Sequence, residues 1–339
     1  MRIQRQIPGA VLCVAIGLAA RVLELAQRTA AGRVWLEALV VALLLGTAIR
    51  WLWTPGDLWN PGIDFAARPV LEAAVVLLGL SVDLPLLVRA GPALALGIVL
   101  VVVLGLASSF TIARRLGLNR HLSLLIACGN SICGNSAIAA VAPTIGAAAD
   151  DIGAAIAFTA ALGVAVVLGL PIAGHALGYT PFQFGVLAGL CVYAVPQVLA
   201  ATLAFDPLSA QVGTLVKLVR VLMLGPVVIT LAVFERRRGT ATAAIQPKLP
   251  PLHALVPWFV LGFLVCVALR FAGVVNAEQA LVARELASAL TIVAMAALGL
   301  GVSVRTLARQ GRSVLAAVTL SLVVLVLISI ALIAGLGVR

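Results

Sequence analysis

Long apolar runs separated by short polar connections dominate the chain. A helix that crosses a membrane needs about 20 apolar residues, and eleven segments reach that length. The predicted spans cover residues 8–27, 34–53, 66–84, 92–114, 121–146, 152–177, 182–204, 210–234, 255–272, 285–304 and 312–336. The longest polar connection, near 235–254, is too short for a separate soluble domain. The pattern predicts an all-α polytopic membrane protein.

The composition supports this class. Hydrophobic residues make up 63% and charged residues 10% of the 339 residues, whereas soluble proteins carry about 25% charged residues. An ordinary cytosolic enzyme and a disordered tail are therefore excluded. The net charge of +11 comes from basic residues scattered between apolar runs, which is typical of loop anchors rather than of a nucleic-acid surface. The five cysteines show no metal-ligand spacing, so we expect no metal site.

Basic residues predict the orientation in the membrane. Glu235-Arg-Arg-Arg238 with Lys248 is the strongest cytoplasmic marker. Placing it inside also places Arg2 and the neighbouring Arg5 inside, which gives a cytoplasmic N-terminus and a periplasmic C-terminus. The same topology puts Arg114, Arg115 and Arg120 inside and Asp150-Asp151 outside. A cleaved signal peptide over the first apolar run is disfavoured, because a second span follows almost at once.

A polar segment interrupts the predicted span 121–146. It contains Gly129, Asn130, Ser131, Gly134, Asn135 and Ser136. Polar side chains in hydrocarbon need partners, and paired glycines weaken a helix. We interpret the segment as a helix break that lines a cavity, where free backbone N–H groups form an anion or ligand site. The alternative is close packing of small residues, although Gly129 and Gly134 miss the usual spacing.

Two cations lie inside the predicted span 210–234. Lys217 and Arg220 are three residues apart and share one helix face, and charges at this depth need a partner. One interpretation is attraction of an oxyanion substrate, which Arg can bind with two donors. The others are a structural salt bridge, with Glu72 as the candidate acid, and snorkelling of both side chains to the interface.

A family resemblance rests on these residues. Gly129-Asn-Ser-Ile-Cys-Gly-Asn-Ser-Ala-Ile-Ala-Ala140 resembles the signature of the YeiH-like sulfate exporter family of bacterial inner-membrane proteins, and Leu215-Val-Lys-Leu-Val-Arg-Val221 is similar to a second family motif. Weaker matches extend over essentially the whole chain. The resemblance implies an architecture related to bile acid–sodium symporters and cation–proton antiporters.

That architecture has two inverted five-helix repeats, with panel and core parts and two crossing broken helices. It divides the chain into an extra N-terminal helix at 1–33 and repeats at 34–178 and 179–339. Helix 285–304 would then supply the second break, at Gly299 and Gly301.

The chain departs from the family pattern in the span 182–204. Tyr193 and Ala194 occupy the positions of a family His-Glu pair, while Gln197 is kept. This loss removes an evident proton carrier. We interpret Tyr193 and Gln197 as lining the cavity; the alternative is that they pack between helices.

These observations predict a secondary active transporter that exports a small anion, sulfate, sulfite or an organosulfonate, by alternating access. Alternatives are an anion channel and a sodium-coupled transporter of another organic anion. We expect no enzymatic activity, since Ser131 and Cys133 have no histidine or acid nearby in sequence. The sequence leaves coupling to Na⁺ or H⁺ open, and we expect no other cofactor and no nucleic-acid partner. The protein is expected to be a multi-pass protein of the bacterial inner membrane and a possible homodimer. The predicted substrate-binding residues are Asn130, Ser131, Gly134, Asn135, Ser136, Tyr193, Gln197, Lys217, Arg220 and Gly299.

Overall fold

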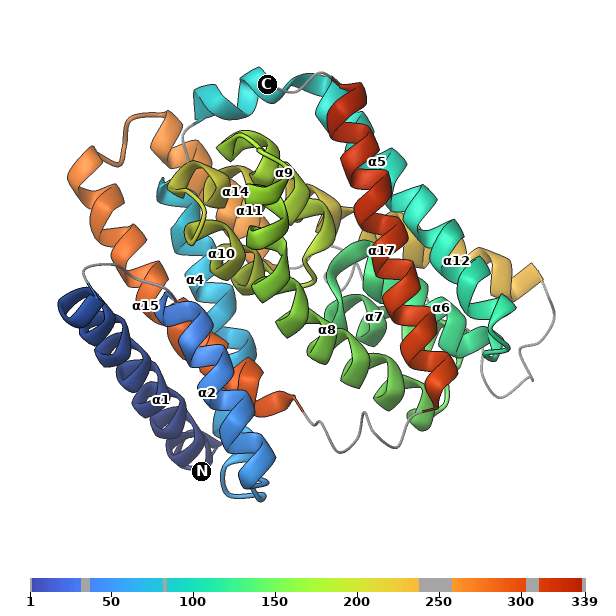
Figure 1. The fold of residues 1–339 in the computed structure, drawn as a ribbon, viewed down its shortest axis with the longest axis horizontal. Helices are drawn as coiled ribbons and strands as arrows, with labels where there is room; N and C mark the ends of the chain where they lie inside the picture. Colours follow the sequence, from blue (N-terminus) through green and yellow to red (C-terminus); the bar gives the residue numbers. More distant parts are fainter. Residues whose placement is uncertain (1, 32–36, 82–83, 238–257, 303–310, 337–339) are drawn as a thin grey trace.

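The computed structural model describes residues 2–31, 37–81, 84–237, 258–302 and 311–336, and within these ranges the chain is helical with no strand (Figure 1). Lys248 and most of the connection near 235–254 lie outside the described residues. Within the described residues, six helical stretches are long and apolar enough to cross a membrane. They are Arg5–Ala30, Gly91–Arg115, Ala149–Ala176, Pro207–Glu235, Ala277–Gly301 and Arg312–Gly335. The helical membrane class is therefore confirmed, whereas eleven spans stay a prediction.

The helices follow the predicted apolar segments closely. In chain order they are α1 (Arg2–Ala31), α2 (Ala38–Leu52), α3 (Asn60–Phe65), the π-helix η1 (Ala66–Val70), α4 (Leu71–Leu78), the 3-10 helix η2 (Gly79–Ser81), α5 (Leu84–Arg115), α6 (Arg120–Cys128), the π-helix η3 (Gly129–Cys133), α7 (Asn135–Ile145), α8 (Ala149–Ala176), α9 (Pro181–Cys191), α10 (Val195–Leu203), α11 (Pro207–Leu222), α12 (Leu224–Arg237), α14 (Trp258–Phe271), α15 (Ala277–Gly301) and α17 (Arg312–Gly335).

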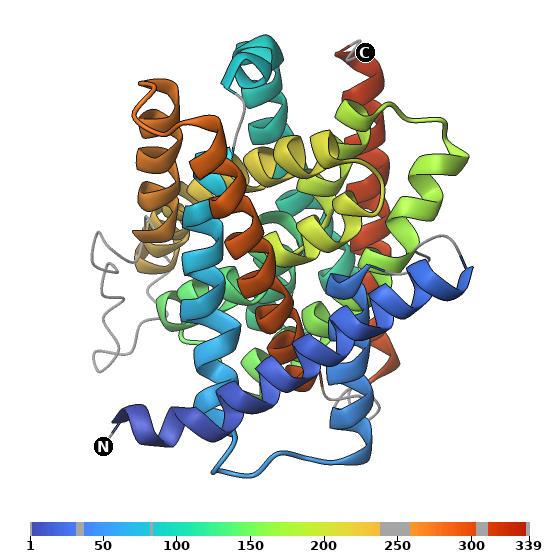
Figure 2. The ribbon, with the colours of Figure 1, turned by 90° about the vertical axis from the view of Figure 1, so that its left-hand side faces the viewer.

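Helices α1, α2 and α15 form one side of the bundle, and α1 lies across the outside of the other two (Figures 1 and 2). α2 and α15 touch backbone to backbone through a pair of glycines. A Cβ added to Gly299 would lie 2.3 Å from the carbonyl oxygen of Leu43, and one added to Gly46 would lie 2.4 Å from that of Ala296. Only glycine allows this approach.

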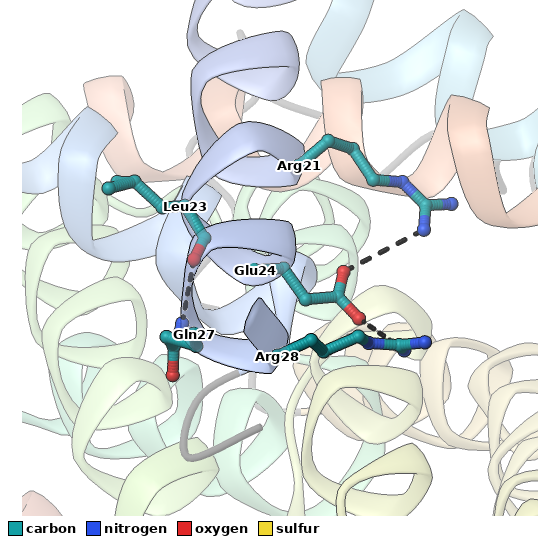
Figure 3. A network of polar contacts seen from close by, with 5 residues as sticks. All are labelled: Arg21, Leu23, Glu24, Gln27 and Arg28. Atoms are coloured by element: carbon teal, nitrogen blue, oxygen red, sulfur yellow. Dashed lines mark hydrogen bonds and ion pairs between the residues drawn. The ribbon is translucent and has the colours of Figure 1, made fainter. Parts of the chain in front are cut away.

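Charged side chains form a network of ion pairs near the C-terminal end of α1 (Figure 3). The buried carboxylate of Glu24 accepts from Arg28 at 2.9 Å and lies 3.7 Å from Arg21. Glu37 lies nearby, in the connection just before α2. Burial raises the pKa of Glu37 to about 7, with a further rise from Glu24 and opposing effects from Arg28 and Arg21.

The predicted span 121–146 is a helical hairpin, which we call hairpin 1 (residues 120–145). At its base, the Asn119 amide donates to Asp151 at 2.9 Å. At its other end, Thr159 donates to the Asn135 side chain at 2.6 Å. Asp151 and Thr159 both belong to α8, so α6 and η3 run alongside α8 and α7 then returns to the base. The side chain of Ile138 accordingly packs against Gly129.

The predicted span 182–204 is a second hairpin, hairpin 2 (residues 181–203). Ser209, in the first turn of α11, donates to the Pro181 carbonyl at 2.7 Å, so α9 and α11 begin together. The rings of Phe184 and Phe205 stack at 4.1 Å between centroids. Since Phe184 starts α9 and Phe205 follows α10, the two arms also meet at their base.

The two hairpins enter the bundle from opposite ends. α8 leads from the base of hairpin 1 to the base of hairpin 2 (Figure 1). An Arg120–Glu235 ion pair then brings the end of α12 back to the base of hairpin 1. Polar backbone inside a membrane is tolerated where protein buries it, and here each hairpin is flanked by a long helix.

This arrangement corrects three predictions. The two breaks lie in hairpins rather than in crossing helices, because the chain reverses at each of them. A second break lies in hairpin 2 and none lies at Gly299, because α15 runs unbroken through that residue. The helix ends at Gly301, before the extended backbone of Val302. Asp151 lies at the same end as Arg120, not at the opposite one. The division at 34–178 and 179–339 stays a prediction.

Candidate functional site

The ends of the two hairpins meet inside the bundle. Tyr193, at the turn of hairpin 2, donates its hydroxyl to the Asn130 side chain at 2.9 Å, and both side chains are buried. Gly134, at the turn of hairpin 1, has φ +65° and a Cβ there would lie 3.1 Å from Cβ of Tyr193. Glycine is therefore required twice, by the left-handed backbone and by the neighbouring ring.

Lys217 and Arg220 of α11 join the two hairpins. Both are 0% exposed. Lys217 donates to the carbonyls of Ile132 at 2.7 Å and Val192 at 2.8 Å. The Arg220 guanidinium donates to hairpin 1 through Nε, to the Ser131 carbonyl at 2.6 Å, and through Nη2, to the Asn130 carbonyl. It donates to hairpin 2 through Nη1, to the carbonyls of Gly189 at 3.3 Å and Val192 at 3.4 Å. Each cation thus bonds to carbonyls from both hairpins.

These carbonyls explain how two buried charges are tolerated. The carbonyls lie at the C-terminal ends of α6–η3 and α9. A helix C-terminus carries about half a negative charge, which stabilises a nearby cation. No carboxylate among the described residues lies within ion-pair distance of either cation. Glu72, the predicted partner, instead accepts from the Trp258 indole at 2.7 Å. The predicted salt bridge is therefore wrong, and snorkelling is wrong because both side chains are fully buried.

The N-termini of α7 and α10 begin at the same turns. The first N–H groups of a helix have no partner within it, and each N-terminus carries about half a positive charge. Asn135 and Ala194, which open these two helices, are partly exposed, and Ser136 is exposed. Contributions from the two N-termini and the two C-termini cancel to a first approximation. Lys217 and Arg220 then leave about two positive charges without a carboxylate.

Helix α8 positions both N-termini. Thr159 bonds to Asn135 at 2.6 Å, and Gly163, one turn further on, faces the buried Gln197. A Cβ on Gly163 would lie 2.4 Å from Nε2 of Gln197. Gln197 in turn accepts from the Ala194 N–H at 3.3 Å. Sequence reasoning missed Thr159 and Gly163, because glycine is frequent in membrane helices and nothing local marked these two residues.

Nine of the ten predicted site residues lie on or beside the two hairpin turns. The Ser131 hydroxyl is buried there without a hydrogen-bond partner and faces Gly105 of α5. Gly299 is the exception, since it packs against α2. The sequence pattern Leu-Gly-Leu-Gly at 298–301 therefore marks a helix contact rather than part of this site.

Comparison with known proteins identifies the family. The family described as conserved hypothetical protein 698 matches residues 8–318, and the chain belongs to it. A UPF0324 membrane protein of Brucella melitensis is 52% identical over 99% of this chain and 93% of its own length. One of Bradyrhizobium diazoefficiens is 51% identical over 98% of this chain and 94% of its own length.

A more distant relative carries a more specific name. The UPF0324 membrane protein TauZ of Paracoccus denitrificans is 34% identical over 82% of each chain. No solved structure matches the chain. The relatives' names agree with the helical membrane class. They do not test the resemblance to sulfate exporters, which stays a prediction.

Proposed function

We propose that the protein is a secondary active transporter of a small anion. The observation that carries the proposal is the pair of buried cations, Lys217 and Arg220, held by carbonyls of two hairpins that enter from opposite ends. Charged groups at this depth mark substrate pathways in membrane proteins. A cationic site with no carboxylate nearby in the described part of the chain attracts anions and repels cations.

The anion binds at the N-termini of α7 and α10, which is the arrangement that favours anions in other helical transporters. Free N–H groups and the side chains of Asn135, Ser136 and Gln197 supply the hydrogen bonds. Lys217 and Arg220 act through their field, since their donors already bond to backbone carbonyls. Alternating access follows when the hairpins open in turn to the two sides.

The substrate class is a sulfur oxyanion, sulfate, sulfite or an organosulfonate. Two observations support it. The relative named TauZ, a name that points to taurine, is 34% identical, and the motif around Gly129 and Gly134 resembles that of sulfate exporters. Several oxygens around one centre suit converging N–H and amide donors. Export is the proposed direction.

A carrier is favoured over a channel by the closed hairpin contact. Tyr193 and Asn130 bond to one another and are 2% and 0% exposed, so no continuous polar path passes between them. A hairpin returns to its own side of the membrane, so the two hairpins leave the expected orientation of the termini unchanged. The N-terminus is cytoplasmic and the C-terminus periplasmic in this proposal.

Counterflow in proteoliposomes tests the proposal. Vesicles are loaded with unlabelled sulfate, sulfite or taurine and supplied outside with the same labelled compound, with and without Na⁺ and a pH gradient. We expect transient, saturable accumulation of at least one of them. We also expect Ser136→Leu to abolish it and Thr230→Leu, at an exposed hydroxyl on α12, to preserve it. Absence of accumulation under every condition, or equal rates for both variants, would refute the proposal.

A further inference from the structure

A cavity of about 140 Å³ lies away from the hairpin turns. Hairpin 2 and α11 form one wall, through Leu203 and Gln211, and α2, η2 and α15 form the other. Its walls come from the start of α2 and α11, from residues 284–291 of α15, and from the end of α10 and η2. The cavity therefore lies at the end of the bundle where hairpin 2 has its base. It is large enough for several waters, and so for a small organic ion.

Arg284 of α15 lines this cavity and is partly buried. Within the described part of the chain it has neither an ion pair nor a hydrogen bond. α15 is one of the candidate spans, where an unpaired cation is costly. Glu285, the next residue, is exposed and its side chain leaves the helix in a different direction.

Two neutral hydrogen-bonding groups join Arg284 in the lining. Gln211 of α11 and Ser288, one turn beyond Arg284, are partly buried, and neither has a hydrogen bond to another described residue. A guanidinium, an amide and a hydroxyl thus line one space from two opposing walls. None of the three has a partner among the described residues, so all of them can offer their hydrogen-bonding groups to one ligand in the cavity.

We propose that this cavity is an anion-binding site distinct from the hairpin turns, and that it takes a small, singly charged oxyanion of the sulfonate class. The guanidinium binds two oxygens side by side, while the amide and hydroxyl bind the third oxygen or a polar group on the ligand. One unpaired cation matches one negative charge. The site does not depend on the proposed transport activity, because none of its residues lies at the hairpin turns.

Isothermal titration of the purified full-length protein in detergent, with methanesulfonate as the probe and ionic strength held constant, tests this site. Arg284→Gln removes the cation. Ala287→Leu fills the cavity, since Ala287 lines it and is 1% exposed, and it keeps the guanidinium. Arg312→Gln is the matched control, because Arg312 is exposed on α17 and its loss changes the net charge equally. The melting temperature of each variant verifies that it is folded.

The comparison is made in the Ser136→Leu background, because that change disables the proposed hairpin site and leaves the cavity intact. There we expect Arg284→Gln to weaken methanesulfonate binding about 10- to 100-fold, the usual value of a lost charge-assisted hydrogen bond, and Ala287→Leu to abolish it. Arg312→Gln in the same background should leave the binding unchanged. Loss of all methanesulfonate binding in the Ser136→Leu protein itself, or equal weakening by Arg312→Gln and Arg284→Gln, would overturn the assignment. Binding that survives while counterflow fails would refute the transport proposal and leave this site standing.

Discussion

The clearest test of how the hairpins are held together is the substitution Lys217→Met. Methionine has a similar length and fits a buried site, but it cannot donate. The Ile132 carbonyl then loses its donor at 2.7 Å, and the Val192 carbonyl keeps only the longer bond from Arg220 at 3.4 Å.

The magnitude follows from these two acceptors. A buried acceptor left without a donor costs about 1–3 kcal/mol. The Ile132 carbonyl loses its donor completely and incurs this full cost, whereas the Val192 carbonyl keeps one longer bond and incurs only part of it. Removing a buried ammonium offsets some of the loss, because its desolvation cost disappears. We therefore expect the free energy of unfolding to fall by about 2–4 kcal/mol.

Thr214→Val is the matched control for this substitution. Thr214 lies on the same helix one turn earlier, is also 0% exposed, and its hydroxyl has no partner. Replacing an unsatisfied hydroxyl by a methyl group should be neutral or stabilising. The assay is reversible unfolding by SDS in mixed micelles, followed by circular dichroism. Equal free energies for the two variants would show that the ammonium does not hold the hairpins, and the electrostatic argument would fail.

Three further predictions compare each substitution with a control, either the same substitution at a second position or the unmodified protein. Gly163→Ala should slow counterflow by displacing the Gln197 amide, whereas Gly169→Ala, where nothing lies within 4 Å of the added Cβ, should not; equal rates would remove Gln197 from the site. Gly299→Ala should destabilise the protein by about 1–3 kcal/mol through overpacking, and Gly301→Ala, also open to space, should be tolerated in the same unfolding assay. Because the pKa of Glu37 rises from 4.5 to about 7 on folding, the folded state binds more protons between these values and stability should fall as pH rises through that window. Glu37→Gln should flatten this pH dependence of the melting temperature, and an unchanged slope would contradict it.

The helical membrane class was predictable because apolar length alone determines it. The same measure could not distinguish a span from a hairpin. Residues 121–146 are long enough to cross, and Gly134 was correctly singled out as a break. Whether the chain continues or reverses after Gly134 depends on distant contacts, chiefly that of Thr159 with Asn135, and these have no local sequence signature.

In the candidate site, too, some features could be predicted from the sequence and others could not. Polar residues within apolar runs, such as Asn130, Lys217 and Arg220, were found because they are costly there. Their partners were not found, because the acceptors are backbone carbonyls, which every residue possesses. Gly299 was assigned wrongly for a related reason. A glycine that lets two helices touch and a glycine that breaks a helix look alike in sequence, and only the contact with Leu43 separates them.

Charge balance at the hairpin turns ranks the possible substrates. The two helix C-termini and the two N-termini contribute opposite half charges that cancel, so Lys217 and Arg220 leave about two positive charges. A dianion such as sulfate neutralises both, a sulfonate neutralises one, and zwitterionic taurine brings no net charge. In a low-dielectric site each unneutralised charge is costly. We therefore expect sulfate or sulfite to inhibit counterflow at lower concentration than methanesulfonate, and taurine to be weakest. The reverse order would mean that one of the two cations is already neutralised, and Arg220→Gln would then retain transport.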